Sequence, residues 1–189
     1  MDKSHETVEI PEPNMARFIF SDARFAWFWL IVRLSVAYQW ITAGWEKANS
    51  PAWVGSHAGN AIAGFFASVQ TKAIGQNPAV APWYASFISH AALPHPVFFS
   101  YLITFGELAV GIGLLLGALT GIAAFFGIVM NLNYLLAGAI SINPLLLILE
   151  VFLVLAWRSA GWIGADRILL PAFGTPWQPG TLFKKRNTS

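Results

Sequence analysis

Four ionisable side chains lie within long apolar stretches of this sequence: Arg33, Glu107, Glu150 and Arg158. An ionisable group at bilayer depth costs about 2.5–3.5 kcal/mol on insertion scales, so it usually faces the interior of a helix bundle and has a partner. From their expected depths, Glu107 is within reach of Arg33 and less surely of Arg158. An arginine–carboxylate contact is either a buried ion pair that fixes helix register or part of a pocket for a polar headgroup, such as a quinone or a small anion.

Other polar side chains could belong to the same pocket. Asn131, Asn133 and Tyr134 lie in the middle of the third apolar stretch, where amides either bridge helices or bind a ligand carbonyl. Glu46 and Lys47 lie where the first stretch is expected to meet the outer surface. They are either solvated neighbours or the lip of a pocket that opens outward, and the sequence leaves both alternatives open.

Several chemistries find no support in the sequence. The absence of cysteine excludes disulfides, thiolate metal sites, iron–sulfur ligation and cysteine redox chemistry within this chain. His57, His90 and His95 lack the spacing of metal ligands on one helix, so we expect no metal site. There is no phosphate-binding loop and no nucleophile-elbow motif. A formal charge of +2 is too small to indicate nucleic-acid binding.

The elements that must position these residues are long apolar helices. Of the 189 residues, 56% are hydrophobic and 11% are charged, whereas soluble domains have about 25% charged residues. Residues 25–43 form one apolar stretch, and residues 97–163 form a longer one with breaks near 119–121 and 141–144. Because about 20 residues cross a bilayer, we predict an all-α membrane protein, a four-transmembrane-helix bundle with spans of about 25–46, 97–119, 121–141 and 144–163.

The segment 48–96 between the first two spans is different. Its prolines break it into pieces too short to cross a bilayer. Apolar residues recur with helical period in residues 62–73 and again after Pro82. We predict two short interfacial helices that lie on the outer face or cap the bundle. The alternative is a compact outer loop whose apolar faces pack on each other.

Basic residues indicate the orientation of the bundle. Arg17 and Arg24 precede the first span, and Arg167 and the basic run 184–186 follow the last. The long loop holds Lys72, and no cleaved signal peptide is apparent at the N-terminus. Because basic residues beside the spans favour the cytoplasm, we expect a multi-pass protein of the plasma membrane with the loop outside. Both tails, 1–24 and 167–189, are then cytoplasmic.

Glycines recur every four residues at Gly113, Gly117 and Gly121. Small residues at this spacing let membrane helices approach one another closely. We interpret the pattern as a packing signal without chemical meaning.

The stretch 106–117, which contains Glu107, resembles the second-helix motif of DoxX- and DoxD-like membrane proteins. The resemblance implies a four-helix membrane bundle and quinone-linked redox chemistry, including the DoxD type of thiosulfate:quinone oxidoreductase. In this sequence Glu107, Arg33 and Lys47 match recurrent polar positions of the family. The similarity covers about residues 25–177, and its other parts are the helix end 43–47, the segment 131–138, Asn143 with Pro144, and the segment 160–167.

We therefore expect a DoxX-like integral membrane subunit of a quinone-linked oxidoreductase. Glu107 is the catalytic candidate, because a carboxyl group beside a quinone can help to move protons. The candidates for binding the quinone are Arg33, Asn131, Tyr134 and Arg158. A quinone is the cofactor that we expect, and no metal, haem or flavin. Electrons would then come from other protein subunits, and the remaining partner is the lipid bilayer, with no nucleic acid.

A second hypothesis is a non-catalytic structural or accessory subunit of a larger membrane complex, respiratory or photosynthetic. The glycine-rich segments, the aromatic residues and the lack of a redox centre in the sequence fit this hypothesis as well. A channel or carrier is a third possibility, which the lack of obvious inverted repeats or broken helices makes less attractive.

Overall fold

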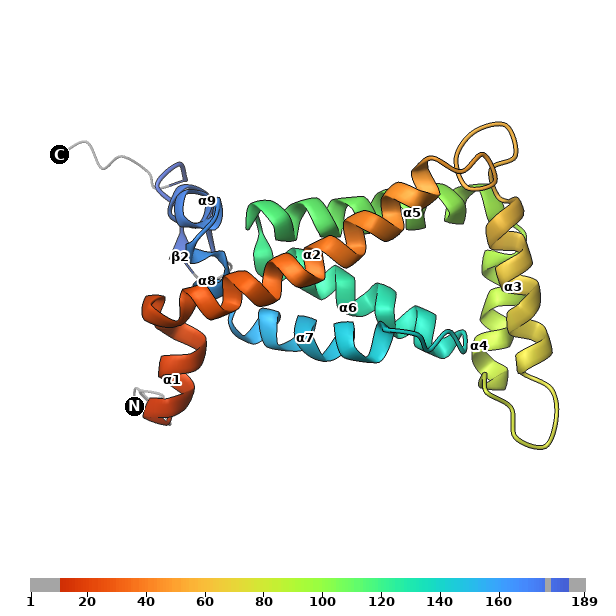
Figure 1. Cartoon of the computed structure of the whole chain (residues 1–189), viewed down its shortest axis with the longest axis horizontal. Helices are drawn as coiled ribbons and strands as arrows, with labels where there is room; N and C mark the ends of the chain where they lie inside the picture. Colours follow the sequence, from red (N-terminus) through yellow and green to blue (C-terminus); the bar gives the residue numbers. More distant parts are fainter. Residues whose placement is uncertain (1–10, 176–177, 184–189) are drawn as a thin grey trace, which may run out of the picture.

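The computed structural model describes residues 11–175 and 178–183, and these residues are helical for most of their length (Figure 1). A 3₁₀ helix, η1 (Ala23–Phe25), a π-helical turn, η2 (Ile88–Ala92), and a small hairpin of β1 (Gly174–Thr175) and β2 (Gln178–Pro179) accompany the α-helices. The α-helices are α1 (Asn14–Ser21), α2 (Ala26–Ala48), α3 (Asn60–Lys72), α4 (Pro82–Phe87), α5 (Pro96–Leu116), α6 (Thr120–Leu136), α7 (Asn143–Leu155), α8 (Trp157–Trp162) and α9 (Asp166–Phe173). The predicted all-α class is confirmed.

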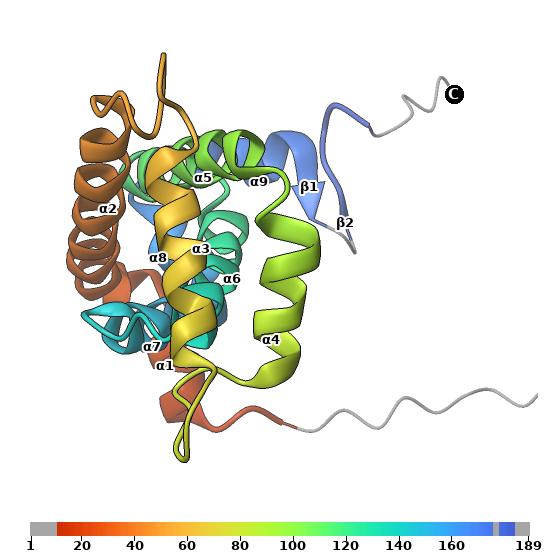
Figure 2. The same cartoon turned by 90° about the vertical axis from the view of Figure 1, so that its right-hand side faces the viewer.

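Four helices, α2, α5, α6 and α7, run along the long axis of the molecule (Figure 1). Helices α3 and α4 lie across one end of this bundle, where Figure 2 shows them in front of the others. Helices α1, α8 and α9 gather at the opposite end (Figure 1). We call these two ends the α3 end and the α1 end. The first and last described helices therefore share one end of the bundle.

Proline and glycine set several helix boundaries. Pro82 begins α4 and Pro96 begins α5, and Pro144 lies in the first turn of α7. Proline is tolerated there because the first N–H groups of a helix have no partner within it. Gly117 ends α5 with a φ of 62°, a left-handed conformation that glycine adopts at little cost.

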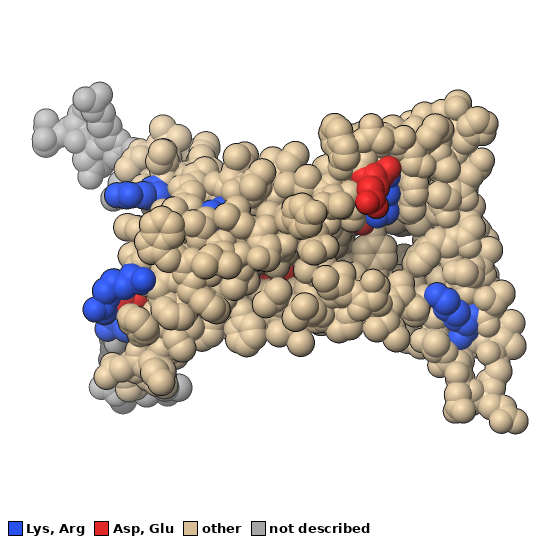
Figure 3. Space-filling view, in the orientation of Figure 1, with Lys and Arg blue, Asp and Glu red and all other residues tan. Residues whose placement is uncertain are grey.

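The surface of the four long helices is apolar, and several polar side chains lie inside. Phe105 on α5 and Phe126 on α6 are 51% and 54% exposed. In contrast, Arg33 and Glu107 are 1% exposed and Glu150 is 0% exposed. Figure 3 shows that charged side chains gather towards the two ends of the molecule, with few of them on the face between. This distribution is the reverse of that in a water-soluble bundle.

The lengths of the helices bear on how they could cross a bilayer. Helix α5 has 21 residues, and it is the helix within the described residues that is long and apolar enough to cross a membrane by length and composition. Helices α6 and α7 are apolar but have 17 and 13 residues. Helix α2 has 23 residues but includes charged and polar side chains.

The structure differs from the sequence-based boundaries in three places. The stretch 144–163 is not one helix, because α7 ends at Leu155 and α8 begins at Trp157. Helix α6 ends at Leu136 rather than near residue 141. Helices α1 and α9 lie in segments that we predicted as tails, while residues 1–10 and 184–189 lie outside the described residues. The two helices predicted in the segment 48–96 are present as α3 and α4.

Candidate functional site

Two glycines bring α2 and α5 close together and so set the geometry of the site. A methyl group on Gly44 would lie 2.8 Å from Cγ of Leu108. A methyl group on Gly111 would lie 2.8 Å from the backbone nitrogen of Ile41 and 2.6 Å from its Cγ1. Backbone atoms cannot move away as a side-chain tip can, so any larger residue at position 111 would force the two helices apart.

We expect Gly111→Ala to destabilise the protein by about 1–3 kcal/mol, the usual cost of overpacking a core. The matched control is Gly64→Ala on α3, because a methyl group there would meet no atom within 4 Å. Gly64→Ala should be neutral or should stabilise the helix by up to about 1 kcal/mol. Thermal unfolding of both variants in the same detergent measures the difference. Equal unfolding temperatures would contradict the close α2–α5 contact.

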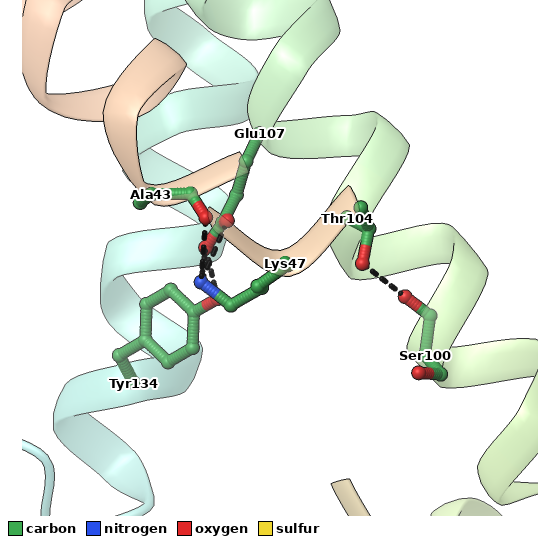
Figure 4. Close-up of polar contacts among 6 residues, drawn as sticks. All are labelled: Ala43, Lys47, Ser100, Thr104, Glu107 and Tyr134. Carbon is green, nitrogen blue, oxygen red and sulfur yellow. Dashed lines mark hydrogen bonds and ion pairs between the residues drawn. The ribbon is translucent and has the colours of Figure 1, made fainter. Parts of the chain in front are cut away.

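Glu107 lies in this contact and binds two partners from neighbouring helices (Figure 4). Lys47 Nζ donates hydrogen bonds to Glu107 Oε1 at 2.9 Å and Oε2 at 2.7 Å. The Tyr134 hydroxyl of α6 donates to Glu107 Oε1 at 2.6 Å. The ring of Trp53 lies beside the ammonium group, with its centroid 5.3 Å from Nζ, a favourable cation–π contact. The cluster therefore connects α2, α5 and α6 through one carboxylate.

An apolar groove runs beside this cluster between α5 and α6. Its volume is about 720 Å³, within the range of small-molecule sites. Tyr134 and Met130 form part of its wall on α6, and Gly106 and Ala109 form part of its wall on α5. From Phe99 to Leu116 the α5 wall extends about 26 Å at about 1.5 Å per residue. The groove is long and almost wholly apolar.

The polar groups of the groove are at its α3 end. There the Tyr84 hydroxyl of α4 donates to the backbone oxygen and to Oδ1 of Asn133, both at 3.1 Å. Burial raises the pKa of Tyr84 to about 12, so its hydroxyl keeps its proton at any physiological pH. Phe65 and Phe66 of α3 cover the groove at this end. A ligand with a polar head and an apolar tail would therefore place its head near Tyr134 and Asn133.

Glu150 occupies a second polar cluster inside the bundle. Its carboxyl group accepts hydrogen bonds from Trp40 Nε1 at 2.5 Å and from Asn131 Nδ2 at 2.7 Å. Gly127 faces this carboxyl group so closely that a methyl group there would collide with it. Asn131 Oδ1 is buried and has no hydrogen-bond partner among the residues that the structure describes. Glu150 and Asn131 are not among the residues that line the groove.

Arg33 lies in a third cluster, at the α1 end, and does not contact Glu107. Its guanidinium donates to the backbone oxygens of Leu114 and Ile163, both at 2.8 Å. Asp166 accepts from the backbone N–H groups of Leu119 at 2.6 Å and Thr120 at 2.8 Å. The cation thus lies at the carboxyl end of α5 and the anion at the amino end of α6, where each is favoured by the helix dipole.

The proposed pairing of Glu107 with Arg33 or Arg158 is not formed. Arg33 and Lys47 lie near opposite ends of α2, about 21 Å apart along its axis, and Lys47 is the one that reaches Glu107. Arg158 is exposed on α8, with its guanidinium 5.1 Å from the centroid of the Trp157 ring. Of the candidate site residues, the structure brings Tyr134 to Glu107 but places Arg33, Asn131 and Arg158 elsewhere.

The sequence reasoning missed the roles of Lys47, Trp40 and Asp166. From the sequence, Lys47 is expected to be either a solvated residue or the lip of an outer pocket, and the family resemblance marks it as a recurrent polar position, but neither pairs it with Glu107. It has the core-facing spacing of Arg33, Trp40 and Gly44 on α2. That spacing was a usable signal, because residues at helical period share one face. Asp166 gave no comparable signal, since it caps a helix that begins far away in the sequence.

The family model described as "TQO small subunit DoxD" matches residues 28–179. The chain belongs to the DoxD family. The match covers α5, α6, α7 and all but the first two residues of α2, together with the clusters around Glu107, Glu150 and Arg33. No curated protein and no solved structure matches the chain significantly. The family name designates a subunit of a thiosulfate:quinone oxidoreductase (TQO), so association with other protein subunits and with membranes belongs to the family.

Proposed function

We propose that this DoxD-family chain is the integral membrane subunit of a thiosulfate:quinone-type oxidoreductase and that its α5–α6 groove binds the quinone. The observation that supports the proposal most strongly is the groove itself. The apolar groove of about 720 Å³ has Tyr134 in its wall, and the Tyr134 hydroxyl donates a hydrogen bond to the buried carboxylate of Glu107. The isoprenoid tail of a quinone suits the apolar part. Its ring suits the end where hydroxyl and amide groups gather.

The proposal includes four membrane spans, formed by α2, α5, α6, and α7 together with α8. Large apolar side chains face outward along these helices, as with Ile31 on α2 and Ile148 on α7, which are 67% and 53% exposed. Helix α6 has 17 residues, about 25 Å, which is short for a hydrocarbon core of about 30 Å. A shorter span is accommodated by local thinning of the bilayer.

The same proposal places the α1 end in the cytoplasm. Arg17 on α1, Arg158 on α8 and Arg167 on α9 are at this end, and basic residues beside the spans favour the cytoplasmic side. Helices α3 and α4 then form a cap at the outer surface. Trp83 of α4, 63% exposed, is a side chain of the type that prefers the level of the lipid headgroups.

In this proposal the electrons reach the quinone from another subunit. The chain contains no cysteine, which excludes a disulfide or an iron–sulfur cluster held by this chain alone. The role of this subunit is then to hold the quinone, to exclude water from its ring and to supply protons. Glu107, Lys47 and Tyr134 are the groups that can do the last of these.

A photoreactive azidoquinone tests the proposed groove in the purified complex. We expect covalent label on peptides of α5 and α6, with unmodified quinone competing for it. Ala109→Trp should lower labelling at least about tenfold, equivalent to about 1.4 kcal/mol, because the indole would fill the groove that Ala109 lines. The matched control is Val151→Trp, which adds the same ring to an exposed position of α7 that does not line the groove.

Label on other helices, or equal labelling of both tryptophan variants, would contradict a quinone site in the groove. That result would favour the other hypothesis, an accessory subunit of a membrane complex without catalytic chemistry of its own. In such a subunit Glu107 and Lys47 would serve only to hold α2 on α5.

A further inference from the structure

A continuous chain of hydrogen bonds connects the groove with the surface at the α3 end. Tyr134 lines the groove and donates to Glu107, which accepts from Lys47 (Figure 4). The side chain of Glu107 is 2% exposed, whereas that of Lys47 is 20% exposed. Each of the three groups can release a proton in one direction and regain one from the other. Such a chain can relay protons between the surface at the α3 end and the groove.

The opposite end of the groove offers no such path among the described residues. Its lining there consists of apolar side chains and glycine, as at Gly113, Leu116, Leu119 and Ile122. Arg33 and Asp166 are buried charged groups at the α1 end, and neither lines the groove. Arg33 donates to backbone carbonyls, and the Asp166 carboxylate accepts from backbone N–H groups, so both are already engaged in holding helix ends.

Glu150 does not provide a second route in the described structure. Its hydrogen-bond partners are Trp40 and Asn131, and neither these partners nor Glu150 lines the groove. Asn131 and Tyr134 are one turn apart on α6, but no hydrogen bond joins the Glu150 cluster to the Glu107 cluster within the described residues. The path through Tyr134 is the connected one.

We propose that both protons that reduce the quinone come from the water at the α3 end of the bundle, through Lys47, Glu107 and Tyr134. This inference rests on the proposed function. The reaction is quinone plus two electrons plus two protons to quinol, with the electrons supplied by the donor subunit. In each passage the Tyr134 hydroxyl gives its proton to a quinone oxygen and regains one from Glu107. Glu107 is reprotonated from the Lys47 ammonium, which regains its proton from water.

The test uses the complete complex in proteoliposomes. Protease added outside cleaves a C-terminal tag only where that tag faces outward, so the cleavage reports the orientation of the complex. The lumen contains a fluorescent pH indicator, the bilayer contains quinone, and reduction is started with the electron donor. Vesicles with the α3 end facing inward should show luminal alkalinisation of two protons per quinol. Vesicles with the α3 end facing outward should show none, and a protonophore should abolish the difference.

Variants of the path sharpen the test. Tyr134→Phe and Lys47→Met should each lower quinone reduction and alkalinisation together, by roughly 100-fold if the groups act in proton transfer. Tyr38→Phe and Glu46→Gln are the matched controls, because both side chains are exposed and neither lines the groove. They should leave both readouts unchanged.

The outcomes separate the two proposals. Quinone reduction with alkalinisation of the compartment at the α1 end would overturn the proton path but not the quinone site. Normal rates in Tyr134→Phe and Lys47→Met would also overturn the path. A wild-type complex that binds no azidoquinone in the groove would overturn the proposed function itself.

Discussion

Glu107→Gln should lower donor-dependent quinone reduction by roughly 100-fold, the lower part of the range for loss of a proton-transferring group. Glutamine has nearly the same shape as glutamate and can still accept the hydrogen bond from Tyr134, which is 2.6 Å long in the native protein. It cannot, however, take up and release a proton. The change therefore removes the proton path while it leaves the packing of α2 on α5 almost intact.

The measurement is the rate of quinol formation in membranes that contain the full complex, together with co-purification of the subunits. Glu46→Gln is the control, because Glu46 precedes Lys47 on α2 and its carboxylate is exposed. We expect the control to retain the wild-type rate and both variants to assemble normally. A wild-type rate for Glu107→Gln would show that the carboxylate only fixes the helices. A loss of assembly would assign it the same structural role.

Arg33→Ala should destabilise the protein most, by about 3–5 kcal/mol, which is the usual cost of leaving a buried charged group without its partner. Arg33 has the largest of the fully buried side chains among the described residues. Its removal would leave a cavity and would free the backbone oxygens of Leu114 and Ile163, to which it donates. It would also leave Asp166 buried without its nearby cation.

Thermal unfolding in detergent compares this variant with two others. Arg33→Lys keeps the charge but cannot reach both carbonyls with a forked group, so an intermediate loss of about 1–3 kcal/mol is expected. Arg24→Ala is the matched control, because the Arg24 side chain is 79% exposed and exposed substitutions usually change stability by less than about 0.5 kcal/mol. Quinone labelling should survive in folded Arg33→Lys. If that variant lost the label while remaining stable, Arg33 would have a binding role after all.

Arg33 and Lys47 show which part of the Glu107 site could be predicted from the sequence. Both residues are on the core face of α2. The cost of a charge at bilayer depth predicts a partner for Arg33, whereas Lys47 is expected at the outer surface. Assigning the partners required the register between α2 and α5. The ends of the apolar stretches predict a register in which Arg33 is the partner of Glu107. In the structure the register is set by the close contacts at Gly44 and Gly111, which place Glu107 beside Lys47.

The three regularly spaced glycines have different roles in the structure. The regular spacing of Gly113, Gly117 and Gly121 indicates close helix packing at each of the three positions. In the structure Gly117 instead ends α5 with a left-handed φ of 62°, while Gly113 faces Ala123 and Gly121 faces Trp157. Spacing along a chain does not distinguish a helix contact from a helix end. The conformation of the following turn decides between them.

The all-α class, the apolar stretches, the helical pieces between the first two of them, and the DoxD-like family could all be predicted from the sequence alone. These follow from composition, from local periodicity and from short motifs, all of which depend on neighbouring residues. The helix packing was needed to show that Tyr134 joins Glu107 and Lys47 beside the groove, and that Arg33 and Glu150 belong to separate clusters. The physical reason is that these contacts join residues far apart in the chain, and such pairs are fixed by how helix surfaces pack rather than by any local pattern.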